Sequence, residues 1–205
     1  MFASCYVYSP GGACATCSRS RLLRALLKAG DERFMQRSAA RVRQQANDSA
    51  ALSGFFHPAD ILIPVPGCRS VPGGTGSVPH RLARALVQHG LGSRVWDGLR
   101  RVRTVRKSAT CAGRRPAVTT HYESLAVEAA AELSAEVRLV LIDDIVTKGR
   151  TFMASASRVA EAYPRNQVLA FALVRTLGLI PGVEHVLDPC VGEIRWCAGD
   201  AQRRP

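Results

Sequence analysis

Short apolar runs alternate with amphipathic stretches along most of the chain. Three runs rich in β-branched residues lie between polar or turn-forming residues, at 61–65, 137–142 and 167–176. Runs of this length and composition are typical of buried strands. Helix-forming composition or apolar residues at helical spacing predict helices at 18–30, 31–45, 80–89, 123–136 and 151–163. Strands alternating with helices predict an α/β domain with a mainly parallel twisted sheet flanked by helices.

Residues at the ends of two helices agree with these limits. Ser18 is a suitable N-cap, and Gly30 suits the residue that ends the same helix. Pro79 lies near the first turn of the helix at 80–89, and Gly90 follows its end, an order typical of helix boundaries. The remaining stretches have a weaker pattern. We expect residues 1–17 to be irregular, 67–79 to be a loop, 100–115 to be an exposed basic segment and the tail from 198 to be frayed.

The net charge of the chain indicates which classes of partner it favours. With 205 residues the chain is the size of one domain, and its formal net charge is +12. This balance favours anionic partners such as nucleotides, phosphorylated sugars or nucleic acid, although a solvated basic surface would give the same value. Residues 1–10 do not resemble a secretory signal, and no apolar run reaches the roughly 20 residues of a membrane span. We therefore expect a cytoplasmic protein with no membrane partner, whose 7 cysteines are thiols or metal ligands.

The strongest motif follows the apolar run at 139–142. Asp143 and Asp144 come next, and then a short loop of small, hydroxylated and basic residues leads into a helix: Thr147, Lys148, Gly149, Arg150 and Thr151. Ligands of open α/β sheets bind at this edge of the sheet. Backbone amides at a helix N-terminus suit a phosphate dianion, and Gly149 allows its close approach. Asp143 and Asp144 suit ribose hydroxyls or a divalent cation such as Mg²⁺.

This segment resembles the motif that binds 5-phosphoribosyl-1-diphosphate (PRPP) in type I phosphoribosyltransferases, with Lys148 where threonine is usual. Adjacent aspartates also occur in P-loop ATPases, but the chain has no Gly-x-x-x-x-Gly-Lys-Ser/Thr segment upstream. Further stretches are similar to the competence protein F (ComF-like) branch of the family: Leu26–Asp31, Asp60–Pro66, His80–Leu86, Leu99–Thr104 and Leu173–Thr176. The resemblance implies a core at 58–180, a hood segment at 1–57, and a C-terminal hood element with a frayed tail at 181–205.

The resemblance also implies which residues bind the diphosphate and which belong to a loop that closes over it. Pro66, Gly67, Cys68 and Arg69 occupy the place of the pyrophosphate loop. Arg103, Arg106 and Lys107 lie where these enzymes have their flexible loop. The chain departs from the ComF-like pattern after Pro66 and again at 105–108, so the pyrophosphate side is altered. A flexible surface turn is the alternative for the first segment. A solvated basic loop is the first alternative for the second, and a patch for single-stranded nucleic acid comes after it, because the segment has no aromatic residue for stacking.

Two functions follow from the resemblance. The first is an enzyme that binds PRPP and Mg²⁺ and transfers the phosphoribosyl group to a nitrogen acceptor with release of pyrophosphate, with Asp143 and Asp144 as catalytic and metal-binding residues. The second is a non-catalytic ComF-like module in DNA uptake or regulation, which binds single-stranded DNA or a protein partner. The altered pyrophosphate region favours the module, whereas the nearly intact phosphate motif favours the enzyme.

Cysteines near the start of the chain have partial metal-ligand spacing. Cys14 and Cys17 form a Cys-x-x-Cys pair with Cys5 nearby. A structural Zn²⁺ site needs about four ligands. ComF-like proteins often carry a four-cysteine zinc element, of which this chain has no complete copy, so packed thiols are the alternative to a zinc site.

Overall fold

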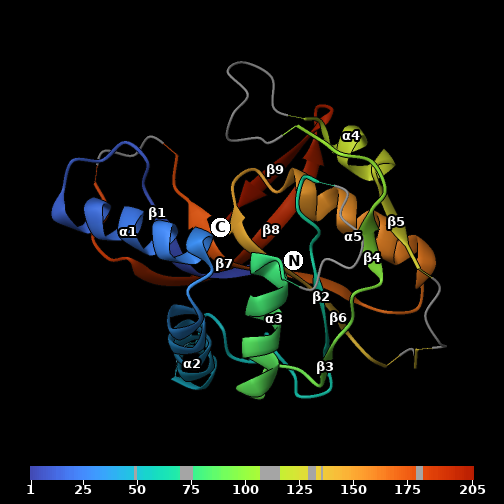
Figure 1. Cartoon of the computed structure of the whole chain (residues 1–205), viewed down its shortest axis with the longest axis horizontal. Helices are drawn as coiled ribbons and strands as arrows, with labels where there is room; N and C mark the ends of the chain where they lie inside the picture. Colours follow the sequence, from blue (N-terminus) through green and yellow to red (C-terminus); the bar gives the residue numbers. More distant parts are fainter. Residues whose placement is uncertain (49, 70–75, 107–115, 129–132, 135, 179–181) are drawn as a thin grey trace.

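The computed structural model describes residues 1–48, 50–69, 76–106, 116–128, 133–134, 136–178 and 182–205. They form an α/β fold with a seven-stranded mixed sheet, flanking helices and a small two-stranded sheet (Figure 1). The strand order is β3-β2-β6-β7-β1-β8-β9. The first five strands are parallel, and the last two are antiparallel to their neighbours. The strands are β1 Phe2–Tyr8, β2 Ile61–Pro64, β3 Arg94–Val95, β6 Leu139–Val146, β7 Val168–Thr176, β8 Leu187–Cys197 and β9 Asp200–Arg204.

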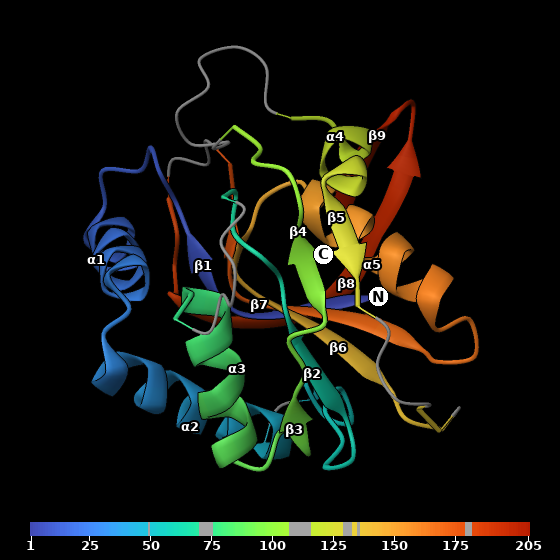
Figure 2. The ribbon, with the colours of Figure 1, turned by 45° about the vertical axis from the view of Figure 1, so that its right-hand side comes forward.

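Helices cover both faces of the sheet (Figure 2). One face carries α1 Ala15–Ala29, α2 Glu32–Asp48 and α3 Val78–Gln88. The other carries α4 Val118–Glu123, α5 Arg150–Ala162 and the small sheet of β4 Leu99–Arg101 and β5 Leu125–Val127. Successive side chains of a strand point to opposite faces. Accordingly, Val140 and Ile142 of β6 join the core under α1–α3, whereas Leu139 and Leu141 join the core under α5.

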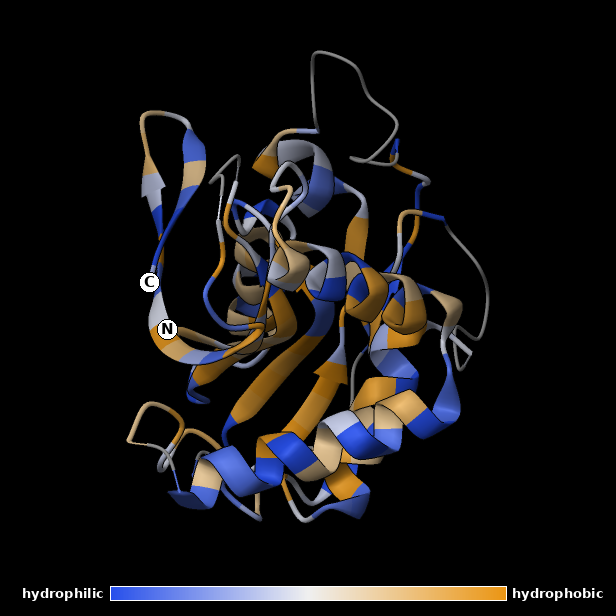
Figure 3. Ribbon diagram, turned by 90° about the vertical axis from the view of Figure 1, so that its left-hand side faces the viewer, coloured by the Kyte–Doolittle hydropathy of each residue, from blue (hydrophilic) through white to orange (hydrophobic). Residues whose placement is uncertain are grey.

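The distribution of hydrophobic residues explains this layering. Figure 3 shows them concentrated in the strands, between helices that mix hydrophobic and hydrophilic residues. Strand β7 is buried along almost its whole length, as expected for a parallel strand with both faces covered. The α/β fold and the mainly parallel sheet predicted from the sequence are therefore confirmed.

Most of the predicted elements are present. Strands β2, β6 and β7 and helices α1, α2, α3 and α5 lie where the apolar pattern predicted them. Gly30 ends α1 in the left-handed conformation, as expected, but α1 begins at Ala15 with Cys14 as its N-cap, before Ser18. Strand β6 runs on to Val146, past the limit predicted for it.

Two terminal stretches were predicted wrongly. Residues 1–17 were expected to be irregular, but Phe2–Tyr8 forms β1, an interior strand between β7 and β8. The tail from Ala198 was expected to be frayed, but β9 pairs with β8 as an antiparallel hairpin. Strand β1 is stabilised by β7 and β8, which lie far from it in the sequence, and a local pattern does not report such partners. Strand β9 pairs with the adjacent β8, whose residues are all exposed or half-buried and give no apolar run.

The prediction of a helix at 123–136 is also wrong for the residues of this range that the structure describes. Helix α4 ends at Glu123, and Leu125–Val127 forms β5, which pairs with Leu99–Arg101 of β4. Pairing and the burial of Leu125 override the helix-forming composition. Residues 129–132 and 135 lie outside the described residues.

The basic segment at 100–115 is only partly as expected. Arg101 lies in β4 and is buried, whereas Arg103 and Arg106 are exposed. Residues 107–115 lie outside the described part of the chain. No helix among the described residues has the length and apolar character needed to cross a membrane.

Candidate functional site

The motif at 143–151 lies at the carboxyl end of β6, where the strand turns into α5. Asp143 and Asp144 are the fifth and sixth residues of β6. The sequence had placed them after the end of the strand, so the strand is longer than predicted. Thr147 and Lys148 form the turn, and Gly149 is the N-cap of α5. Gly149 has no side chain with which to cap this helix end. Amides of the first turn of a helix have no partner within the helix and point outward, so this turn suits an anion.

Gly149 is required here for two reasons. Its φ of +87° is in the left-handed region, which residues with a Cβ rarely adopt. A Cβ on Gly149 would also lie 2.7 Å from Ile194 Cδ1 of β8, inside van der Waals contact. The hairpin of β8 and β9 therefore packs directly against the loop that precedes α5.

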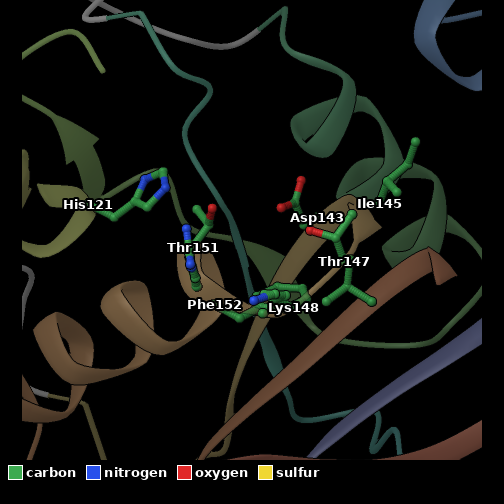
Figure 4. Close-up of a pocket in the computed structure, with 10 residues that line it drawn as sticks. His121, Asp143, Ile145, Thr147, Lys148, Thr151 and Phe152 are labelled. Carbon is green, nitrogen blue, oxygen red and sulfur yellow. The ribbon is translucent and has the colours of Figure 1, made fainter. Parts of the chain in front are cut away.

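The residues of the motif line one pocket. Its walls come from the end of β6, the loop, the first turn of α5 and helix α4: His121, Asp143, Ile145, Val146, Thr147, Lys148, Gly149, Arg150, Thr151 and Phe152. Figure 4 shows His121 on one side and Asp143 and Thr147 on the other. All five residues predicted to bind phosphate are thus brought together with one of the two predicted acidic residues.

The two aspartates lie on opposite faces of the sheet. Asp143 lines the pocket, and its Oδ1 accepts a hydrogen bond of 2.8 Å from the Asp144 amide. Asp144 is buried on the other face, where Lys28 Nζ of α1 lies 2.5 Å from its Oδ2. The structure therefore brings Asp143, but not the Asp144 carboxylate, to the loop of residues 147–151.

The carboxyl group of Asp143 is held in an unusual electrostatic state. Burial, followed by the neighbouring Asp144 charge, raises the pKa of Asp143 well above its usual value. The Lys28 ammonium opposes this shift. A carboxyl group with this shift gains from a nearby cation, because a positive charge stabilises its ionised form.

His121 is a pocket residue that the sequence analysis did not single out. Burial, with the positive charges of Arg101 and Arg150, lowers the pKa of His121 to about 4, so the imidazole is neutral at pH 7. Its Nδ1 is buried and has no hydrogen-bond partner among the described residues. The sequence carries no signal for this residue, because His121 reaches the pocket only through the packing of α4 against α5.

Asp200 of β9 holds the basic side chains of the loop. Arg150 Nε lies 2.5 Å from Asp200 Oδ1 and Arg150 Nη2 lies 2.6 Å from Oδ2, while Lys148 Nζ lies 3.2 Å from Oδ2. The hydrogen bond from Arg150 is the main cause of a pKa for Asp200 well below its usual range. Arg203 of the same strand donates to the Thr147 carbonyl oxygen at 2.8 Å. The C-terminal hairpin thus braces the loop, and Asp200 offsets the charge of Lys148 and Arg150.

The predicted pyrophosphate residues lie at the same edge of the sheet. Strand β2 pairs in parallel with β6, so the loop of Pro66, Gly67, Cys68 and Arg69 follows β2 beside the end of β6. The buried Arg101 guanidinium donates to the Gly67 carbonyl oxygen and the Ser124 hydroxyl, and it lies 3.4 Å from the Pro66 carbonyl oxygen. Arg101 therefore fixes the course of this loop.

The predicted flexible loop leaves β4 along the same edge. The Val105 amide donates to the Cys68 carbonyl oxygen at 2.8 Å, and Arg103 Nη2 donates to the Glu123 carbonyl oxygen at 3.0 Å. Arg106 is exposed, and Lys107 lies outside the described residues.

A wider groove adjoins the pocket. It is lined by the loop, the end of β7 and the C-terminal hairpin: Pro10, Thr147, Lys148, Thr176, Leu177, Gly178, Cys197, Asp200, Ala201, Gln202 and Arg203. Because Thr147 and Lys148 line both cavities, a ligand in the groove would lie next to a ligand in the pocket.

The three cysteines considered for Zn²⁺ do not form one cluster. Cys14 and Cys17 are close together at the start of α1, with Val7 and Val183 around them. Cys5 lies in the larger core under α1, α2 and α3. Among the described residues, no three His, Cys, Asp or Glu side chains are grouped as a metal site would require.

Comparison with protein-family models gives no match, and comparison with curated proteins gives none either. The resemblance read from the sequence and the observed structure agree on an α/β fold with a mostly parallel, mixed sheet.

Proposed function

We propose that this protein binds a ribose 5-phosphate group, as PRPP or as a nucleotide, in the pocket at the carboxyl end of β6. The observation that carries the proposal is the convergence of the uncapped N-terminus of α5, the Thr147–Thr151 loop and the Asp143 carboxylate on one pocket. Amides and the helix dipole favour a phosphate, and a carboxylate beside them suits the ribose hydroxyls. The pocket thus offers complementary groups to the two ends of one ligand.

Main-chain groups would carry most of the phosphate contacts. Asp200 already engages Lys148 and Arg150, so their charge reaches the pocket only in part. The Thr147 and Thr151 hydroxyls and the neutral His121 imidazole remain as side-chain partners around the amides. Gly149 allows the backbone to take the turn that aims these amides.

The other end of the ligand would extend toward the end of β2. The Pro66–Arg69 loop lies there, its course fixed by Arg101, and it would hold the diphosphate. Magnesium prefers oxygen ligands, and Asp143 offers a carboxylate at the pocket wall. Asp144 is engaged by Lys28, so Asp143 would hold Mg²⁺ together with ligand oxygens. When bound, the ion would offset the negative charge of the diphosphate.

With this ligand, the chain would act as a phosphoribosyltransferase of the type I family, closest to the ComF-like branch. It would transfer the phosphoribosyl group to a nitrogen acceptor and release pyrophosphate. Asp143 would stabilise positive charge that develops on the ribose ring. The groove beside the pocket offers room for the acceptor, because it opens onto the same loop.

One observation favours the second candidate, a non-catalytic ComF-like module. Lys28 pairs with Asp144 at 2.5 Å, which removes one of the two acidic groups that the phosphoribosyltransferase motif supplies. Such a module would keep phosphoribosyl or nucleotide binding and act through single-stranded DNA or a protein partner. The exposed arginines of α2 offer a basic surface for DNA: Arg33, Arg37, Arg41 and Arg43.

Calorimetric titration with PRPP and Mg²⁺ tests the first candidate. Asp143→Asn should weaken metal-dependent binding by about tenfold or more, and the exposed Asp48→Asn should leave it unchanged. Saturable binding by the wild type would justify a screen of nitrogen acceptors for pyrophosphate release. The absence of binding by a well-folded wild type refutes the proposal.

Binding of single-stranded DNA tests the second candidate. Fluorescence anisotropy at two salt concentrations should show affinity that falls steeply as salt rises, since phosphate contacts release counterions. Replacing Arg37 and Arg41 with glutamine should reduce the slope. A wild type that binds no DNA at low salt would exclude this role for the basic face of α2.

A further inference from the structure

Cys14 and Cys17 form a close pair at the N-terminus of α1. Cys14 is the N-cap residue, and its Sγ accepts a hydrogen bond from the Cys17 amide at 3.1 Å. The Cys14 Sγ also lies 3.9 Å from the Val183 carbonyl oxygen. Three residues after an N-cap, the chain has made one helical turn, so the second thiol returns to the side of the first.

The surroundings of Cys14 favour its thiolate. Hydrogen bonds from Cys17, with the side-chain contact as the largest, lower the pKa of Cys14 to about 7. The first turn of α1 contains no acidic residue, and the positive end of the helix dipole faces the sulfur. A thiolate at a helix N-terminus is the reactive form of cysteine in thiol chemistry.

The two thiols differ in access. Cys14 is half-buried, so a small molecule can reach it, whereas Cys17 is fully buried behind it with Val7. This order, an accessible thiol followed by a sheltered one, suits an attacking and a resolving cysteine. Elsewhere, burial raises the pKa of Cys5 to about 12, and the exposed Cys197 lies on a different element, β8.

We propose that Cys14 and Cys17 form a redox-active dithiol that undergoes exchange with low-molecular-weight disulfides. The Cys14 thiolate attacks one sulfur of the disulfide, forms a mixed disulfide and displaces one thiolate. Cys17 then attacks the Cys14 sulfur and passes its proton to the second thiolate, which leaves as a thiol. Two protein thiols are oxidised to a disulfide while one external disulfide is reduced to two thiols. The proposal does not depend on the phosphoribosyl site.

Equilibration of the reduced full-length protein with glutathione buffers tests this proposal. After acid quenching and alkylation, peptide mass spectrometry should find a Cys14–Cys17 disulfide that increases with the oxidised fraction of glutathione. Cys17→Ser should instead retain glutathione on Cys14, because the resolving thiol is gone. Cys14→Ser should react at neither position. Cys197→Ser is the matched control and should leave the Cys14–Cys17 disulfide unchanged.

A second measurement needs no variant. The rate of Cys14 alkylation by iodoacetamide, followed against pH in the wild type, should reach half its maximum near pH 7. A midpoint near the roughly 8.5 of an ordinary thiol would overturn the proposal. Glutathione that persists on Cys14 in the wild type would also overturn it. Stoichiometric zinc in the purified protein that Cys14→Ser abolishes would make the pair a metal site instead.

Discussion

Replacement of Gly149 by alanine tests how the loop between β6 and α5 is held in place. Gly149 lies between β6 and α5 with a φ of +87°, and Ile194 of the C-terminal hairpin packs over it. Alanine adds a single methyl group and no charge. Any effect of Gly149→Ala therefore reports backbone strain and the contact with Ile194.

The expected cost has two parts. A residue with a Cβ in the left-handed region costs about 1–2 kcal/mol. The new Cβ would lie 2.7 Å from Ile194 Cδ1, 2.8 Å from Cγ2 and 2.9 Å from Cγ1, so the side chain cannot avoid it by moving one atom. Overpacking of this kind costs about 1–3 kcal/mol. Because Ile194 is only half-buried, we expect a total of about 2–4 kcal/mol.

Urea denaturation of the wild type and four variants separates the two parts. Gly54 has a φ of +70° with nothing within 4 Å of its would-be Cβ, so Gly54→Ala carries the backbone cost alone. Gly149→Ala should lower the free energy of unfolding by about 1–3 kcal/mol more than Gly54→Ala does. In the double variant Gly149→Ala/Ile194→Ala, this excess should disappear once the cost of Ile194→Ala is subtracted.

Two results would refute the reasoning. Equal destabilisation by Gly149→Ala and Gly54→Ala would mean that Ile194 does not press on the loop. A coupling energy near zero between positions 149 and 194 would mean the same, even if Gly149→Ala is costly. In either case Ile194 would not brace the loop, and the hairpin would hold it through Asp200 and Arg203 alone.

Three further predictions follow from the ion pairs and from His121. Asp200→Asn should lower the free energy of unfolding by about 1.5 kcal/mol at pH 7. The pKa of Asp200 is lowered in the folded protein, so the difference in unfolding free energy between wild type and variant should be constant above pH about 4. It should decline as the pH falls further, toward the pKa of Asp200 in the folded protein, and a difference that does not change with pH would contradict this prediction. Arg138→Met should lower the free energy of unfolding, measured with urea, by about 3 kcal/mol. The variant leaves the buried Asp60 carboxylate without the guanidinium that lies 2.7 Å away, and a loss below about 1 kcal/mol would count against that ion pair. The imidazole of His121, followed by NMR, should titrate near pH 4, and a midpoint near 6.5 would show that it is exposed to solvent. Since the unfolded chain binds the proton more tightly, His121 should make stability fall as pH drops from about 6.5 to 4, and His121→Gln should remove that component.

The sequence predicted the central elements because their signals are local. The apolar runs of β2, β6 and β7 are long enough to identify alone, and Gly30 ends α1 where expected. Strand β1 was missed because its seven residues precede a Gly- and Cys-containing stretch and are stabilised by β7 and β8. The β8–β9 hairpin was missed because most of β8 is exposed or half-buried and shows no apolar run.

The candidate site was predicted in composition but not in arrangement. Residues 147–151 and Asp143 line one pocket, as their spacing predicted. The pairing of Asp144 with Lys28 depends on α1, which lies far from β6 along the chain. Asp200 likewise approaches the loop only because β9 folds back over α5. Contacts between distant segments follow from the tertiary fold, and residue spacing within a motif does not contain them.

The position of β1 also bears on how the protein is made. Phe2 pairs with Ala170 on one side and with Gly192 on the other, so both partners of β1 are synthesised long after it. At about 5–20 residues per second, the ribosome needs roughly ten seconds or more to produce them. During that interval Phe2–Tyr8 is an apolar strand with no sheet to join, and it is available to chaperones and to other nascent chains. Closure of the sheet must therefore wait until β7 and β8 have been synthesised, and the yield of folded protein in a cell should respond to chaperone supply.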